Sequence, residues 1–235
     1  MTTPAVGDGN AAAQPDYAPI PRSALGPALN EQGYYVGRVE RNLYYVTDGV
    51  YQSAFLSTPD GVVLFDTPPT IGHNLRRAVD EITAAEGVTN RVTHMVYSHH
   101  HDDHTGASSI FGSDVVRIGH EETRRLLLRD NNSARPAPEV TFADSYTLQV
   151  GGERVELAWH GPNHSPDNIY IHFPDHDAVR RGQERRLVDA VGDVVQVPLH
   201  AADVVALVVQ GRAQRGPGNR RVVGQGHGVV DADCW

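Results

Sequence analysis

The chain has 235 residues, of which 40% are hydrophobic, so it can bury one sizeable α/β core. Its formal net charge is −9, which argues against nucleic acid as a partner. All 20 basic residues are arginine, so no lysine can serve as a Schiff base or nucleophile. The only cysteine, Cys234, excludes an intrachain disulfide and a cysteine-rich metal site. No run approaches the roughly 18 apolar residues of a membrane span, and the first residues do not read as a signal peptide. We therefore expect a cytoplasmic protein without a membrane partner.

The composition along the chain predicts a loose N-terminal arm followed by one domain. Residues 1–30 mix Ala, Pro, Gly and Asn without periodicity and cannot bury much surface, whereas residues 31–235 form the domain. Residues 34–66 are rich in β-forming residues and contain two Asp-Gly pairs at 48–49 and 60–61. This pattern predicts an antiparallel meander.

Helices and strands alternate after the meander. Apolar residues at helical spacing predict a helix over 72–86 that ends at Gly87, and the apolar run 92–97 predicts a buried strand. The elements expected beyond it are a short helix at 108–111, a strand at 114–118, a helix at 120–130, a hairpin about 151–152 and a strand at 169–173. Strand and helix alternation of this kind is typical of an α/β fold.

A dense polar cluster follows directly after the strand at 92–97. Its residues His99, His101, Asp103 and His104 fit the pattern H-x-H-x-D-H. Two imidazoles at i and i+2 can converge on one cation, and the Asp-His pair can turn towards a second; zinc accepts such nitrogen and oxygen donors. A solvated polar loop is the alternative. Four His and two Asp in six residues at the mouth of an apolar strand favour the metal site.

The motifs VVLFDTPP, THMVYSHHHDDHTGA and GPNHSPDNIYIHFP resemble the metallo-β-lactamase superfamily of binuclear metallohydrolases, over about residues 34–173. The resemblance implies an α/β fold, a four-layer αβ/βα sandwich of two mixed β-sheets flanked by helices. It also implies two zinc ions, or iron in their place. By position, His99, His101 and His164 correspond to ligands of one metal, and Asp103 and His104 to ligands of the second. Asp66 matches an aspartate that lies behind the metals and orients a histidine.

The remaining ligands fall in an atypical segment, 178–235, which leaves open whether the C-terminal part of the fold is complete. The resemblance calls for a bridging acidic residue, for which Asp189 is favoured over Asp193, and for a last histidine, which His227 in a Gly-His-Gly turn matches. The arginine-rich run RRGQERR interrupts this region. If the sequence after about residue 179 is out of frame, Asp189 and His227 are coincidences.

The function implied is hydrolysis of an ester, lactone, thioester or amide bond in a small molecule by a zinc-bound hydroxide, with Asp103 as the catalytic proton acceptor. Two alternatives remain open: an iron-dependent redox enzyme on the same fold, and a non-catalytic metal-binding remnant. The oligomeric state is not indicated. We interpret His100 and Asp102 as loop residues that point away from the metals. We interpret His94, in the strand, and His120, at a helix N-terminus, as structural or surface residues. The same interpretation applies to four histidines that show no converging partner: His73, His172, His176 and His200. His160 is near the site in sequence, and we do not expect it to be a ligand.

Overall fold

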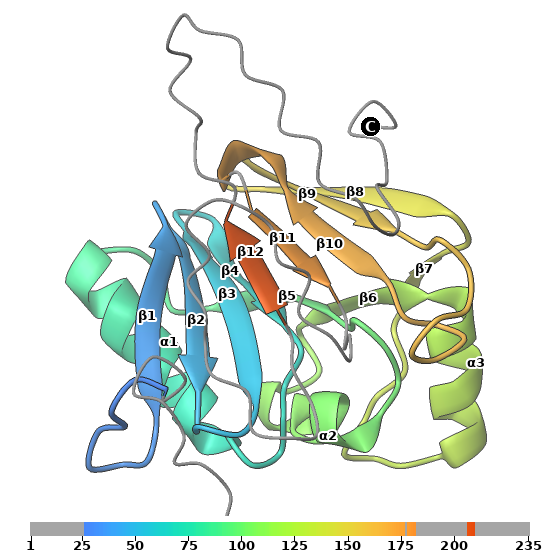
Figure 1. The fold of residues 1–235 in the computed structure, drawn as a ribbon, viewed down its shortest axis with the longest axis horizontal. Coiled ribbons are helices and arrows are strands. Elements are labelled where there is room, and N and C mark those ends of the chain that lie inside the picture. The colour runs from blue at the N-terminus through green and yellow to red at the C-terminus, as the bar shows by residue number, and fades with distance from the viewer. Residues whose placement is uncertain (1–25, 177, 182–205, 210–235) are drawn as a thin grey trace, which may run out of the picture.

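The computed structural model describes residues 26–176, 178–181 and 206–209, and its strands form two sheets (Figure 1). The first sheet has the order β1 (Tyr35–Glu40), β2 (Leu43–Thr47), β3 (Gln52–Thr58), β4 (Gly61–Phe65), β5 (Val92–Val96), β6 (Val116–His120) and β7 (Val140–Phe142). The second has the order β12 (Ala206–Val209), β11 (Ala178–Arg181), β10 (Tyr170–Phe173), β9 (Glu153–Ala158) and β8 (Ser145–Val150). The helices are α1 (His73–Glu86), the single turn α2 (Asp102–Thr105) and α3 (Glu121–Asp130), with 3-10 turns at Ser108–Phe111 and Pro174–His176.

The first sheet is mixed, as expected. Strands β1 to β4 pair antiparallel, which confirms the meander, and β4 to β7 pair in parallel. Helix α1 connects β4 to β5 and ends at Gly87, whose φ of 69° suits glycine in a left-handed cap. The described strands of the second sheet pair antiparallel throughout, so this sheet is not mixed over the described part of the chain.

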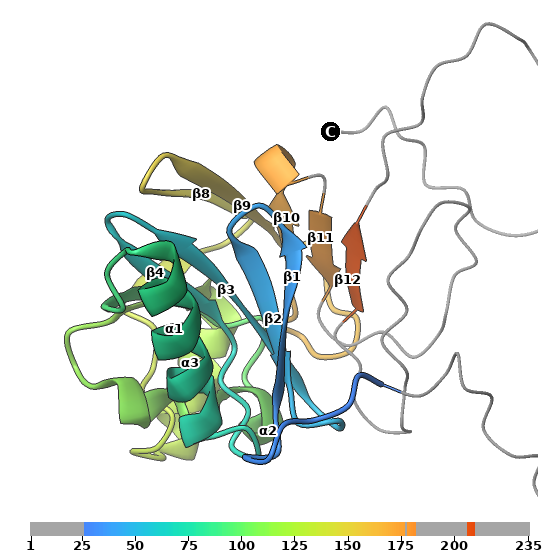
Figure 2. The ribbon, with the colours of Figure 1, turned by 90° about the vertical axis from the view of Figure 1, so that its left-hand side faces the viewer.

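Two apolar cores hold three layers together. The first lies between α1, through Leu75 and Val79, and one face of the first sheet, through Phe55 and Leu64. The second lies between the two sheets and includes the edge-to-face contact of Phe65 with Phe173, whose ring centroids are 4.9 Å apart. Figure 2 shows α1 and α3 on the side of the first sheet that faces away from the second sheet. The α/β fold class is therefore confirmed, although no α-helix among the described residues forms the fourth layer.

The parallel strands determine where a site can form. Their carboxyl ends meet at one edge of the first sheet, where the loops after β4, β5 and β6 lie together. The loop between β9 and β10 reaches the same edge, since the amide of Ile169 donates to the carbonyl of Ser98 at 2.9 Å. The long stretch of polar residues after β5 thus faces a loop from the second sheet.

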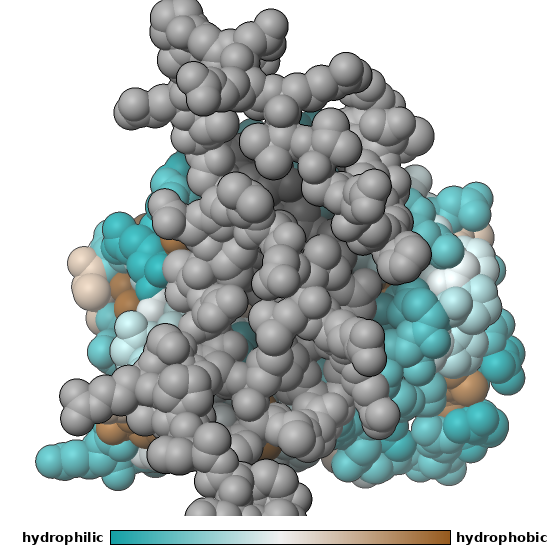
Figure 3. Space-filling view, viewed as in Figure 1, coloured by the Kyte–Doolittle hydropathy of each residue, from teal (hydrophilic) through white to brown (hydrophobic). Residues whose placement is uncertain are grey.

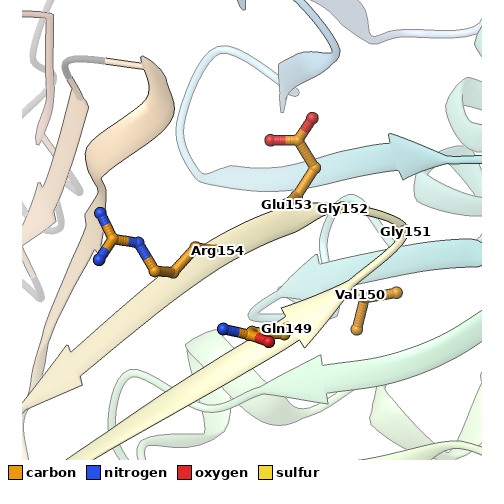
Figure 4. A pocket seen from close by; sticks show the side chains of 6 residues that line it. All are labelled: Gln149, Val150, Gly151, Gly152, Glu153 and Arg154. Atoms are coloured by element: carbon orange, nitrogen blue, oxygen red, sulfur yellow. The ribbon is translucent and has the colours of Figure 1, made fainter.

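The surface of the described residues is mostly hydrophilic where Figure 3 shows it, with apolar side chains scattered singly. A shallow hollow lies at the β8–β9 hairpin, lined by residues 149–154, and Figure 4 shows Glu153 and Arg154 beside it. Gly151 of this hairpin lies against Thr58 of the β3–β4 turn, at the opposite end of the first sheet from the polar loop after β5. Among the described helices, none is long and apolar enough to cross a membrane.

Candidate metal centre

Three histidines from two loops converge at the carboxyl edge of the first sheet. Each of His99, His101 and His164 offers a ring nitrogen, and these nitrogens lie within 4.8 Å of one another. His164 Nε2 is 3.2 Å from His101 Nδ1, although the residues are 63 positions apart in sequence. The structure thus brings together the three residues predicted to hold the first metal. Metal binding by them stays a prediction.

A hydrogen-bond chain leaves one nitrogen of His99 ready to bind a cation. The hydroxyl of Ser98 donates to Asp66 Oδ2 at 2.7 Å, and His99 Nδ1 lies 2.9 Å from the same hydroxyl oxygen. Because the hydroxyl hydrogen is donated to the carboxylate, the hydroxyl oxygen accepts a hydrogen bond from the N–H at His99 Nδ1. His99 Nε2 then carries a lone pair, and it is buried with no hydrogen-bond partner in the structure. A buried bare nitrogen is costly unless a ligand uses it.

His104 also has one ring nitrogen in a hydrogen bond and the other buried without one. Its Nδ1 lies 3.2 Å from Asp66 Oδ2 and donates to it, and its Nε2 is buried without a hydrogen-bond partner. Asp103, the other residue predicted for the second metal, has Oδ2 3.9 Å from His104 Nε2. The two predicted donors of the second site are therefore neighbours, one buried and one partly exposed.

The Asp66 carboxylate contacts His104 directly and His99 through the hydroxyl of Ser98. Its side chain is fully buried, and its Oδ1 also accepts from the amide of Ser98 at 2.8 Å. It follows β4 with a φ of 61°, a left-handed conformation that aspartate tolerates better than most residues. The position predicted for Asp66 from the resemblance, behind a histidine, agrees with its contact to His104.

Burial keeps the histidines in the form that binds metals. Burial, with a smaller contribution from the neighbouring His104, lowers the pKa of His99 well below its usual value. Burial also lowers the pKa of His101. Both rings are therefore neutral near pH 7, as a metal-bound imidazole must be.

The donor set fits a transition metal. Three imidazole nitrogens match the protein ligands of a catalytic zinc site, and the same donors suit iron. Of the donors predicted for a second site, Asp103 and His104 are among the described residues. Asp189, its alternative Asp193 and His227 lie outside the described residues.

Several other histidines have structural contacts, as interpreted, but two have partners that the sequence did not indicate. His120 caps α3 by accepting from the amide of Glu122 at 3.2 Å. His172 Nδ1 lies 3.0 Å from a carboxylate oxygen of Glu156, so it has a converging partner. His176 is buried, and its Nε2 lies 2.8 Å from Glu153 Oε2. The expectation that His172 and His176 lack partners is wrong, because their partners come from another strand.

Comparisons with known proteins bear on the family and the fold of this chain. The sequence model of the family described as Metallo-beta-lactamase superfamily matches residues 46–182, which is more than half of the chain. The chain belongs to this superfamily. Its solved neighbours include metallo-beta-lactamase IND-7, with a TM-score of 0.55, 21% identity and coverage of 69% of this chain and 77% of that one. DIM-1 metallo-beta-lactamase gives a TM-score of 0.53 at 18% identity, over 68% and 73% of the two chains. These neighbours support the fold.

Two curated relatives of this chain have names that describe different activities. One is 2,4-dinitroanisole O-demethylase subunit alpha of Nocardioides sp. (strain JS1661), 26% identical over 67% of this chain and 46% of its own. Another is Metallo-beta-lactamase type 2 of Elizabethkingia meningoseptica, 26% identical over 59% of this chain and 57% of its own. The chain thus spans about half the length of these relatives.

Proposed function

We propose that this chain is a zinc-dependent hydrolase that cleaves an ester, lactone, thioester or amide bond of a small molecule. The observation that carries the proposal is the buried, unpartnered Nε2 of His99 beside His101 and His164. A hydrogen bond already occupies the other ring nitrogen of His99, so the bare nitrogen faces the cluster in the protonation state that a metal requires.

The candidate site residues have three roles in this proposal: holding metal, accepting a proton and setting the protonation of the histidines. His99, His101 and His164 would hold the first metal, and Asp103 and His104 would supply donors for a second. A zinc ion held by these residues would supply a hydroxide near neutral pH, because zinc lowers the pKa of a bound water to about 7. The same ion would polarise the carbonyl of the substrate. The Asp103 carboxylate would accept the proton that the water loses, and Asp66 would keep the Nε2 atoms of His99 and His104 unprotonated.

One relative favours a second candidate activity. The match to an O-demethylase subunit that acts on 2,4-dinitroanisole makes hydrolytic cleavage of an activated methyl aryl ether a candidate for this chain. In that reaction hydroxide would form a bond to the ring carbon that carries the methoxy group, methoxide would leave, and the proton of the new phenol would convert methoxide to methanol. It uses the same metal site as carbonyl hydrolysis.

The test is a substrate panel assayed on metal-free and zinc-loaded protein. The panel contains p-nitrophenyl esters, lactones, thioesters, a chromogenic β-lactam and 2,4-dinitroanisole. We expect turnover of at least one carbonyl substrate that chelator removes and zinc restores. Turnover of the ether alone would select the second candidate. Turnover that depends on iron and on an oxidant would overturn hydrolysis in favour of a redox reaction. Metal binding without turnover of any substrate would support a non-catalytic metal-binding protein.

A further inference from the structure

A second buried carboxylate, Asp167, belongs to the loop between β9 and β10 and contacts His100 of the loop after β5. Its Oδ1 accepts hydrogen bonds from His100 Nδ1 at 2.9 Å and from Ser165 Oγ at 2.7 Å. Its Oδ2 accepts one from Thr123 Oγ1 at 2.8 Å. The donors belong to the loop after β5, the loop between β9 and β10, and helix α3. The carboxylate therefore joins both loops to a rigid helix.

The two donors to Oδ1 are direct neighbours of two candidate ligands. His100 precedes His101, and the two rings are packed with their centroids 4.7 Å apart. Ser165 follows His164, whose Nε2 is 3.2 Å from His101 Nδ1. One oxygen atom thus holds the residues next to both members of this close pair.

His100 is held at its backbone as well as at its ring. Arg135 donates from NH1 to the carbonyl of His100 at 2.9 Å, and Arg135 is itself held by Asp102, at 3.1 Å, and Asp130, at 3.3 Å. Both the ring and the carbonyl of the residue that precedes His101 are therefore held, by Asp167 and by Arg135.

Asp167 is charged under ordinary conditions. Burial alone would raise its pKa, but the hydrogen bonds from His100, Ser165 and Thr123 outweigh burial and lower the pKa to about 2. Hydrogen bonds to an ionised acceptor are about twice as strong as neutral ones. The charged Asp167 therefore holds its three donors more firmly than a neutral acceptor would.

We propose that Asp167 is a positioning residue of the first metal site, which holds His101 and His164 at the separation that one metal ion needs. This inference rests on the proposed function only in that it takes His99, His101 and His164 as the ligands. Asp167 touches neither substrate nor metal in this scheme.

The test compares zinc affinity and cobalt spectra of the wild type and Asp167→Asn. Zinc affinity is measured by competition with a chromophoric chelator, and the absorption of bound Co²⁺ reports the geometry of the ligands. We expect zinc to bind about 10–100-fold more weakly to Asp167→Asn, as is typical when a ligand loses its hydrogen-bonding support. We also expect the cobalt spectrum to change.

Glu153→Gln is the matched control. Glu153 is also a buried carboxylate paired with a histidine, since its Oε2 lies 2.8 Å from His176 Nε2. It begins β9 at the hairpin that packs on the β3–β4 turn, far from the candidate ligands. We expect Glu153→Gln to lower stability without changing zinc affinity or the cobalt spectrum. An equal loss of affinity in this control would overturn the proposal.

His100→Ala is the variant that tests the positioning role if Asp167→Asn does not fold. It removes one donor to Asp167 and leaves the carboxylate itself in place, and we expect weaker zinc binding in the same direction. A folded Asp167→Asn or His100→Ala with the affinity and spectrum of the wild type would refute the positioning role. A wild-type chain that binds neither zinc nor cobalt would overturn the proposed function, and this assignment with it.

Discussion

Replacing Asp66 by Asn removes the acceptor on which two candidate ligands depend. Asp66 Oδ2 accepts from Ser98 Oγ and from His104 Nδ1, while Oδ1 accepts from the amide of Ser98. Asn keeps an oxygen for that amide, but it places an NH₂ group where two donors point. Asn also tolerates the φ of 61° at this position, so the backbone need not move.

The magnitude follows from the two lost hydrogen bonds. A hydrogen bond to a charged group contributes about 1.5–3 kcal/mol, and the Ser98 hydroxyl can rotate to recover part of its own, so we expect Asp66→Asn to lower the free energy of unfolding by about 3 kcal/mol. A loss of 1 kcal/mol shifts the Tm of a domain of this size by roughly 2–4 °C, so Tm should fall by about 6–12 °C.

Metal affinity provides a second, independent measurement for this variant. An NH₂ group facing His104 Nδ1 favours the tautomer with its proton on Nε2, which cannot bind a metal, and loss of the Ser98 contact affects His99 in the same way. Zinc should bind about 10–100-fold more weakly. Calorimetry of the metal-free protein and chelator competition measure the two effects. Asp114→Asn, at an exposed position before β6, is the control. A Tm within about 2 °C of the wild type together with unchanged zinc affinity would refute the role assigned to Asp66.

Three further predictions concern catalysis, pH and the C-terminal segment. Asp103→Asn should leave Tm nearly unchanged and lower kcat by about 10²–10⁴-fold, since an amide cannot accept the proton; an unchanged kcat in steady-state assays would refute that role. The lowered pKa values of His99 and His101 mean that the unfolded chain binds more protons below pH 6.5, so the metal-free protein should lose stability as pH falls below 6.5. Denaturant unfolding at several pH values checks this, and greater stability at pH 5 than at pH 7 would contradict it. If the family match ends at residue 182 because the following sequence is out of frame, Asp189→Ala and His227→Ala should leave zinc stoichiometry unchanged, with weak occupancy of the second site in the wild type. Selective loss of the second ion in either variant, or full and tight double occupancy in the wild type, would show that the segment is in frame.

Local sequence patterns predicted most of the described fold. The 14-residue helix α1 and the strands β1 to β5 follow from residue spacing, turn residues and β-forming composition, all of which act within a few positions. Helix α2 was missed, because a single turn at 102–105 is too short to show periodicity, and β7 was missed because it has only three residues.

The candidate site was predictable only in part. The H-x-H-x-D-H pattern and the resemblance placed His99, His101 and His164 in one cluster, and the structure brings their ring nitrogens together. The pairing of His100 with Asp167 spans 67 positions and depends on how two loops meet, so no local pattern could show it. Its one sequence signal is that Asp167 lies three residues after His164, within the same GPNHSPDN motif.

Zinc content per chain in the wild type and in His101→Ala tests the central claim most directly. The proteins are loaded with zinc, dialysed against buffer with a weak chelator, and analysed for bound metal. We expect the wild type to retain zinc in the first site and His101→Ala to lose it, because only His99 and His164 would remain of the three converging nitrogens. Equal, tightly bound zinc in both proteins would contradict the assignment of the histidine cluster as the metal site.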